Sequence, residues 1–271
     1  MMIKRAKLVA VTKPNPDALI EEFDPGKMTA PNAQDLIAYC ARVSNPTNQG
    51  NFDTANKLLT YCMNNKHWSP FEMVHVVIEI NTTRDIARQI LRHRSFSFQE
   101  FSQRYADPNQ LGFTIRDARL QDQKNRQNSI EGADEELIRA WQIKQTQLLH
   151  EIKLAYKWAI SAGIAKELAR VVLPEGNTNS RLYMSGSLRS WIHYCQLRMG
   201  NGTQKEHQEI ATDIWNILCG EFPFLRELSK PVATTDTITT IYKQGDYVKF
   251  MEVPDDDELR PRKTWWKRWG F

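Results

Sequence analysis

A single uninterrupted helical pattern, from Asp134 to Ser161, most constrains what this chain can fold into. Its apolar residues recur every three or four positions, which predicts one long helix with a buried stripe. Gly163 follows two residues after Ser161, and glycine readily adopts the left-handed conformation that often ends a helix. We expect the stripe to consist of Leu137, Trp141, Leu148, Ile152 and Ala155.

Shorter patterns flank this helix on both sides and alternate irregularly between helix and strand. Helical spacing is found in 33–43, 52–63, 81–91, 164–173, 188–197 and 204–218. Strand signals are found in 3–12, 73–80, 179–185, 237–242 and 247–253. Because these do not form a regular βαβ series, we predict an α+β fold with long helices packed on a mixed or antiparallel sheet.

Domain organisation follows from where the patterns stop. Residues 1–230 are expected to form one catalytic domain, with the polar segment 107–132 as a surface insertion. Residues 231–271 are expected to form a C-terminal extension. It ends in a basic and aromatic tail with Trp265, Trp266 and Trp269, for which we favour packing on the same domain or on a neighbouring subunit.

Charge and cysteine usage narrow the functional class. The net charge of +4 and the pI near 8.8 permit an anionic small-molecule substrate and do not require nucleic acid. The four cysteines are far apart in sequence and resemble reduced cytoplasmic thiols. No membrane span is expected. No histidine spacing indicates a metal site; His75 is expected to be structural, and His150 and His207 to be solvated or capping.

The segment from Arg92 to Tyr105 carries most of the chemistry. It holds three arginines, one histidine and one glutamate. Arginine charge does not titrate near neutrality, so these groups suit anion binding and carbonyl polarisation. An exposed basic loop with weak surface ion pairs would explain the charges equally well. The interleaved aromatic residues favour a packed setting: Phe96, Phe98, Phe101 and Tyr105.

Recognisable motifs occur in order along the chain. Arg92-His93-Arg94, then seven residues, then Ser102-Gln-Arg-Tyr resembles the signature of the flavin-dependent thymidylate synthases. Further segments are also similar to that family: 41–44 (ARVS), 67–72 (HWSPFE), 169–174 (ARVVLP) and 187–198. Gln204 and Glu206 fit the family segment that follows. The resemblance implies an enzyme that methylates dUMP to dTMP, with FAD as cofactor and 5,10-methylenetetrahydrofolate and NADPH as co-substrates. It also implies a homotetramer with active sites between subunits.

The resemblance assigns roles residue by residue. It implies FAD contacts from Ser44, Ser69, Glu72, Arg92, His93, Arg94, Ser95, Ser187, Arg189 and His193. It implies dUMP contacts from Gln89, Glu100, Ser102, Gln103, Arg104, Arg170 and Arg198. Within these sets, Ser102, Arg170 and Arg198, with His67, are the candidate catalytic residues, and Ser102 is expected to position or polarise.

Departures from the family pattern occur at Trp68, Ser187, His193 and 199–202. Two other functions remain open. One is a nucleic-acid-binding protein that uses the Arg92–Arg104 loop and the tryptophan-rich tail, with steeply salt-dependent binding. The other is an inactive relative that keeps the fold as an interaction module, which the intact Glu100, Ser102, Arg104 and Arg170 disfavour.

Overall fold

A computed structural model describes residues 5–20, 29–228 and 241–242 of the chain. Its centre is a four-stranded sheet in the order β1 (Ala6–Val11), β2 (His75–Thr83), β7 (Asn179–Ser187) and β3 (Ser97–Glu100). All neighbouring strands run antiparallel, and β1 carries a register shift between Leu8 and Ala10. The predicted α+β class is therefore confirmed.

Alternation along the two long strands decides which face of the sheet is buried. Val76, Ile78 and Ile80 of β2 are fully buried, as are Leu182 and Met184 of β7. In antiparallel register Ile78 lies opposite Met184, and Ile80 opposite Leu182. Since side chains of a strand alternate between faces, these residues form one continuous apolar surface.

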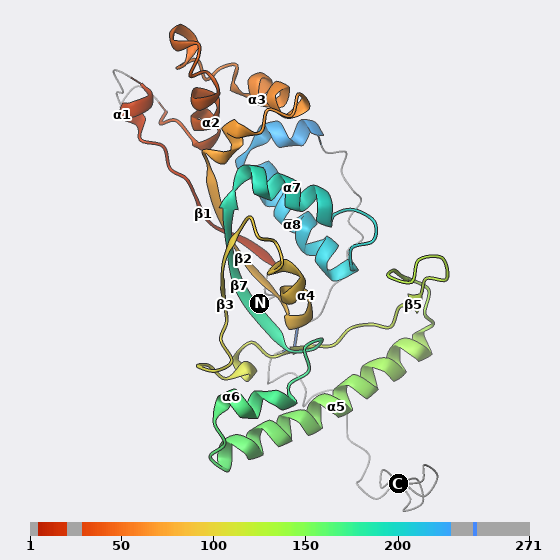
Figure 1. Cartoon of the computed structure of the whole chain (residues 1–271). Coiled ribbons are helices and arrows are strands. Elements are labelled where there is room, and N and C mark those ends of the chain that lie inside the picture. The colour runs from red at the N-terminus through yellow and green to blue at the C-terminus, as the bar shows by residue number, and fades with distance from the viewer. Residues whose placement is uncertain (1–4, 21–28, 229–240, 243–271) are drawn as a thin grey trace, which may run out of the picture.

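Helices cover this surface and its two ends (Figure 1). On the buried face lie α4 (Arg84–Ile90), α7 (Leu188–Arg198) and α8 (Lys205–Glu221). Beyond one end lie α1 (Pro16–Leu19), α2 (Ala33–Ala41) and α3 (Ala55–Asn64). Asn32 and Asp35 form a reciprocal capping box at the start of α2. Short 3₁₀ turns occupy Pro46–Asn48, Ser69–Glu72, Pro108–Gln110, Arg170–Val172 and Pro223–Leu228.

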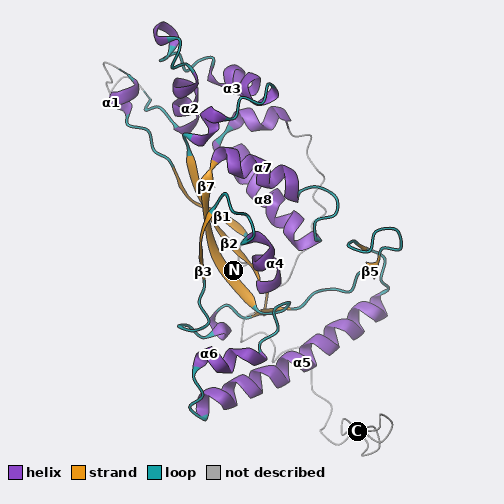
Figure 2. Ribbon diagram, in the orientation of Figure 1, coloured by secondary structure: helices purple, strands orange, loops and turns teal. Residues whose placement is uncertain are grey.

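The long helix α5 (Glu135–Ser161) lies with α6 (Lys166–Ala169) at the opposite end of the sheet (Figure 2). Asp134 caps its N-terminus, and Gly163 follows its end at φ +80° as predicted. The predicted buried stripe is wrong for this chain, because Leu137, Trp141, Leu148 and Ala155 are exposed and Ile152 is only partly buried. Gln145, Leu149, Tyr156 and Ala159 are buried instead. Helical periodicity identifies an apolar face but not what covers it.

The 107–132 segment is more than the surface excursion predicted from its polarity. It contains β4 (Phe113–Thr114), β5 (Leu120–Gln121) and β6 (Ser129–Ile130), and both residues of β4 are buried. β4 pairs with β8 (Ile241–Tyr242), the last two residues of the strand predicted at 237–242. The strand predicted at 247–253 and the tail tryptophans lie outside the described residues.

Across the described ranges, no helix combines the length and apolarity needed to cross a bilayer.

Candidate active site

The Arg92–Ser95 loop follows α4 and is anchored by aromatic packing. Phe96 and Phe98 pack against the hydrophobic core, whereas Arg92, Arg94 and Ser95 are largely accessible. Phe96 lies so close to Gly186 of β7 that a Cβ on that glycine would sit 2.5 Å from Phe96 Cδ1. Phe96 and Phe98 therefore hold the loop in a packed setting, as predicted, and leave its cations accessible. The prediction is wrong for Tyr105, which is 82% exposed.

His93 is held as a neutral acceptor. Arg198, at the end of α7, donates from Nε to His93 Nε2 over 2.9 Å. Burial, and then the charges of Arg198 and Arg92, lower the pKa of His93 from 6.5 to about 4. At neutral pH His93 therefore accepts a hydrogen bond and does not carry a proton back and forth.

A second group of predicted residues lies where the Ser69–Glu72 turn meets the start of α7. Glu72 pairs with Arg189 at 2.7 Å, and hydrogen bonds from Ser187 and Arg189 lower the pKa of Glu72. Ser187 caps α7 by accepting from the Ser190 amide. The His193 ring lies 4.4 Å from the Trp68 ring, centroid to centroid. Ser69 and His67 are both exposed nearby in sequence, and His67 packs edge-on against Tyr61.

Ser44 lines an open cavity of about 520 Å³ between α2 and α3. Arg42, which is only 7% exposed, also lines it and donates to the Asn51 carbonyl and to the Thr54 hydroxyl. Lys57 adds a second cation to the wall. A cavity with two cations and a serine hydroxyl suits a phosphate-bearing group.

Glu100, the last residue of β3, and the residues that follow it form a separate group with the Arg170–Val172 turn. Glu100 accepts from Ser180 Oγ at 2.8 Å and lies 3.5 Å from Arg84. Arg104 pairs with Glu167 at 3.2 Å, and Arg170 Nε donates to the Glu167 carbonyl at 3.3 Å.

The remaining members of this group are Ser102 and Gln103. Ser102 Oγ accepts from the Arg104 amide. Gln103 is only 4% exposed, and its Nε2 has no partner among the described residues. Ser102, Gln103, Arg104 and Arg170 are thus brought together, as the sequence implied.

The Arg104–Arg170 group and the His93–Arg198 pair are two separate groups in the structure. Arg170 precedes the start of β7, whereas α7 and Arg198 follow its end. A nine-residue strand extends roughly 30 Å at about 3.3 Å per residue. Among the described residues, no hydrogen bond or ion pair joins the Arg104–Arg170 group to the His93–Arg198 pair. In the described part of the chain, Arg198 therefore shares no contact with Arg104 or Arg170.

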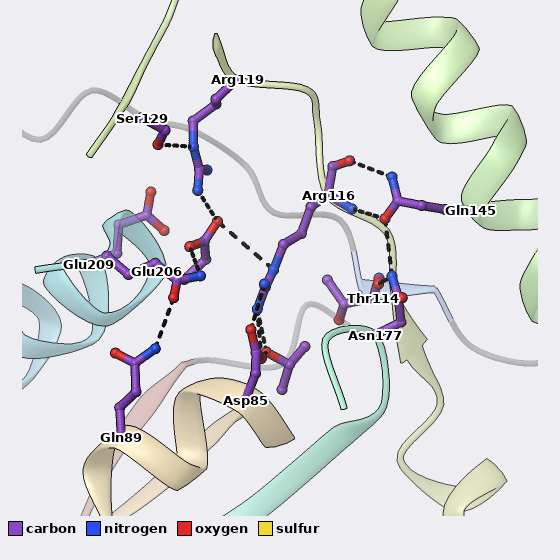
Figure 3. Close-up of polar contacts among 12 residues, drawn as sticks. Asp85, Gln89, Thr114, Arg116, Arg119, Ser129, Gln145, Asn177, Glu206 and Glu209 are labelled. Carbon is purple, nitrogen blue, oxygen red and sulfur yellow. Dashed lines mark hydrogen bonds and ion pairs between the residues drawn. The ribbon is translucent and has the colours of Figure 1, made fainter. Parts of the chain in front are cut away.

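Gln89 belongs to a polar network that the sequence did not reveal (Figure 3). Its Nε2 donates to Gln204 Oε1 at 2.8 Å, and its Oε1 lies 3.3 Å from His207 Nδ1. Gln204 Nε2 donates to Glu206 Oε2 at 2.9 Å, and Glu206 Oε1 pairs with Arg119 at 2.7 Å. The 107–132 segment is therefore linked to Gln89 indirectly, through Glu206 and Gln204.

His207 is fully buried, so the prediction of a solvated or capping histidine is wrong. Tyr194 OH lies 2.9 Å from His207 Nε2. Burial, then the charges of Arg198 and His93, lower the pKa of His207 to about 3, and burial raises the pKa of Tyr194 well above its usual value. Its place on the apolar stripe of α8, with Ile210, Ala211 and Ile214, is the signal that identifies it as buried.

Comparisons with known proteins agree with the motifs. The model of the family "Thymidylate synthase complementing protein" matches residues 27–224. A "probable flavin-dependent thymidylate synthase" of Paramecium bursaria Chlorella virus 1 is 47% identical over 218 residues, which are 80% of this chain and 95% of that protein. A flavin-dependent thymidylate synthase of Synechocystis sp. is 48% identical over 217 residues, with the same shares.

A solved structure shares the fold. The UMP/dUMP methylase PolB from Streptomyces cacaoi, crystallised with 5-Br dUMP, superposes with a TM-score of 0.65 at 22% identity and covers 82% of this chain and 92% of its own. At this identity the likeness concerns the fold alone. The family model and the relatives that are nearly half identical show that this chain belongs to the flavin-dependent thymidylate synthase family.

Proposed function

We propose that this protein catalyses the reductive methylation of dUMP to dTMP, with FAD as cofactor, 5,10-methylenetetrahydrofolate as carbon donor and NADPH as reductant. The observation that carries the proposal is the 47–48% identity to relatives named for this activity, over 95% of their length. We assign the activity to residues 1–230 and treat 231–271 as an extension.

The residues present fit FAD. The cations of the Ser44 cavity suit the diphosphate, and the accessible loop of Arg92, Arg94 and Ser95 offers further donors. We propose the remaining contacts at Ser69, Glu72, His93, Ser187, Arg189 and His193. When bound, FAD supplies a hydride. His93 stays neutral beside it and offers no proton, because burial and the charge of Arg198 both oppose its protonation.

The group after β3 fits an anionic nucleotide. Arg104 and Arg170 are fixed charges that both contact Glu167, so one can bind the phosphate while the other stabilises negative charge developing on the pyrimidine. Glu100, Gln103, Gln89 and Arg198 are proposed as further dUMP contacts. Ser102 Oγ already accepts a hydrogen bond from the Arg104 backbone N–H, which suits a positioning hydroxyl. His67 is proposed to shape the flavin or folate pocket.

Assembly into a homotetramer with active sites between subunits would join the separated groups. The exposed apolar side chains at the end of the molecule support such an assembly: Leu137, Trp141, Leu148, Leu154, Trp158, Leu168 and Val171. Trp158 is 67% exposed, and large apolar side chains exposed together on neighbouring elements favour an interface. We also propose a cytoplasmic location, which is where free thiols such as Cys40, Cys62, Cys195 and Cys219 persist.

The nucleic-acid-binding alternative gains no support from the described residues. Arg104 is paired with Glu167, and the aromatic residues at 96 and 98 pack inward instead of offering stacking surfaces. The tryptophans that it needs lie outside the described ranges.

Purified protein tests the proposal directly. We expect a flavin absorbance band, and dTMP formed from dUMP only when methylenetetrahydrofolate and NADPH are both added. Reactions lacking one component at a time provide the controls. A colourless protein that takes up no FAD on reconstitution and forms no dTMP would contradict the proposal.

A further inference from the structure

We propose that Glu206 sets the direction of a hydrogen-bond chain running through Gln204, Gln89 and His207 to Tyr194, and thereby fixes which end of the Gln89 carboxamide is presented to the nucleotide. The chain direction stands on geometry alone. Its consequence for the nucleotide rests on the function proposed above.

The chain links three helices and the residue before one of them. Gln89 lies on α4, Tyr194 on α7, and Glu206 and His207 on the first turn of α8, with Gln204 just before it. The four successive contacts measure 2.9 Å, 2.8 Å, 3.3 Å and 2.9 Å from Glu206 to Tyr194. Gln89 has one partner on its oxygen and one on its nitrogen, so its amide cannot rotate without breaking both.

The Glu206 carboxylate determines which atom donates in each hydrogen bond of the chain. An ionised carboxylate can only accept, so Gln204 must turn its NH₂ toward Glu206 and its oxygen toward Gln89. Gln89 then donates to that oxygen and turns its own oxygen toward His207. His207 must therefore carry its proton on Nδ1, which leaves Nε2 to accept from Tyr194 OH.

Two arginines of the 107–132 segment keep Glu206 ionised. Arg119 lies 2.7 Å and Arg116 3.9 Å from Glu206 Oε1 (Figure 3). Burial alone would raise the pKa of Glu206, but the hydrogen bond from Arg119 and the two charges outweigh burial and lower it. Arg116 is itself fixed by Asp85 at 2.7 Å. The first turn of a helix also favours a negative charge.

Replacing the carboxylate with an amide reverses the chain. In Glu206→Gln the new oxygen faces the two guanidinium groups, so the new NH₂ faces the NH₂ of Gln204. Relief requires Gln204 to flip, then Gln89, and finally His207 to move its proton from Nδ1 to Nε2. Tyr194 then accepts from His207. No atom is gained or lost in this rearrangement, and each hydrogen bond is remade in the opposite direction.

The protonated nitrogen of His207 reports this direction without any substrate. We would label the whole protein with ¹⁵N-histidine and record solid-state spectra near neutral pH, assigning His207 from a His207→Gln sample. We expect the proton on Nδ1 in the parent protein and on Nε2 in Glu206→Gln. A His207 that keeps its Nδ1 proton in the variant would overturn the proposal.

Glu209→Gln is the matched control. It makes the same chemical change on the same helix, but Glu209 pairs with Arg5, which is not a member of the chain. We expect its His207 spectrum to match the parent. A shift of the proton in this control would also overturn the proposal, because it would show that lost charge alone moves the proton.

A double variant tests the mechanism by rescue. In Gln204→Glu with Glu206→Gln, the carboxylate moves one step along the chain. It accepts from the new carboxamide at position 206 on one side and from Gln89 on the other, so Gln89 and His207 regain their original orientations. We expect the Nδ1 proton to return; its absence would overturn the assignment of direction to the carboxylate.

Binding of dUMP to the FAD-loaded protein then measures the consequence for substrate. We expect the dissociation constant for dUMP to rise about tenfold in Glu206→Gln, because the reversed Gln89 carboxamide then sets a donor against a donor of the nucleotide, or an acceptor against an acceptor. We expect the constant to recover in the double variant. Unchanged affinity in a variant whose tautomer has switched would overturn the role of Gln89. If the parent itself binds no dUMP, the proposed function fails, whereas the histidine spectra still decide the chain direction.

Discussion

Arg198 donates its Nε hydrogen to Nε2 of His93 over 2.9 Å, so a guanidinium with fixed charge rests on an imidazole that must stay neutral. The contact joins the end of α7 to the loop after α4. It places a cation where anionic ligands are expected and leaves His93 unable to compete for that ligand as a second cation.

Removing this arginine should shift the titration of His93. In Arg198→Ala we expect the pKa of His93 to rise from about 4, and to stay below 6.5 because burial, its larger cause, remains. Histidine NMR titration measures the shift. Arg189→Ala, which removes a cation paired with Glu72, should leave His93 unchanged. An unmoved His93 in Arg198→Ala would contradict the assignment.

Buried His207 should make the fold sensitive to acid. Its pKa is about 3 in the folded chain and about 6.5 when unfolded, so the unfolded state binds more protons below pH 6.5. The contribution of neutral His207 to the free energy of unfolding is therefore fully present above that pH and is lost as the pH falls toward 3. His207→Gln should flatten urea-unfolding stability between pH 6.5 and 5 by up to about 1.4 kcal/mol per pH unit, whereas exposed His150→Gln should not. Equal slopes in parent and variant would count against it.

The exposed face of α5 should hold subunits together. Trp158→Glu places a charge on that face and should lower the molar mass measured by light scattering after size exclusion. Arg139→Glu reverses an exposed charge on the same helix, about half a turn away from Leu137, Trp141 and Leu148, and should leave the mass unchanged. An undiminished mass in Trp158→Glu would exclude this face as an interface.

Gly186 should be intolerant of a side chain. A Cβ there would meet the Phe96 ring at 2.5 Å, so Gly186→Ala should displace the ring, cost about 1–3 kcal/mol and reduce the FAD retained on purification. A Cβ on Gly220 of α8 would meet nothing within 4 Å, so Gly220→Ala should keep or raise stability. Denaturation curves and flavin absorbance measure both; normal flavin content in Gly186→Ala would contradict the packing role.

Arg170 should matter for turnover and not for folding. Its Nε donates to the Glu167 carbonyl at 3.3 Å, a bond that contributes little stability. Arg170→Ala should lower dTMP formation by about 100-fold or more, with the melting temperature retained. Arg139→Ala, exposed on α5, serves as the control. Undiminished turnover in Arg170→Ala would remove it from the proposed substrate site.

Local pattern is enough to predict most elements. The β-branched and apolar residues of β2 and β7 identify those strands, and Gly163 identifies the end of α5. The helix predicted from residue 81 begins only at Arg84, because residues 81–83 satisfy their backbone in the sheet. The helix predicted at 164–173 is split into α6 and a 3₁₀ turn. Neither the start at Arg84 nor the split of 164–173 can be predicted from local propensity, because partners that are distant in sequence determine both.

Site residues can be predicted from sequence where they belong to one local motif. They cannot be predicted where only tertiary contacts bring them together. Spacing along one segment brings Ser102 and Arg104 together, and contacts with Glu167 add Arg170. Glu206, Arg116 and Arg119 meet across long separations, so nothing local marks them as partners. The apolar stripe predicted for α5 is wrong for a related reason: periodicity cannot tell a face that packs on the core from one left exposed.

The place of β7 in the sheet has a consequence for synthesis on the ribosome. β7 lies between β2 and β3, and Tyr183 reaches back to Glu79 across 104 residues of sequence. Both of those strands are therefore synthesised before their shared neighbour, and each keeps an open edge until residues 179–187 are translated. A chain cut short before residue 179 would yield β1 and β2 as a pair and leave β3 without a neighbour, so no product that ends before β7 can assemble the four-stranded sheet.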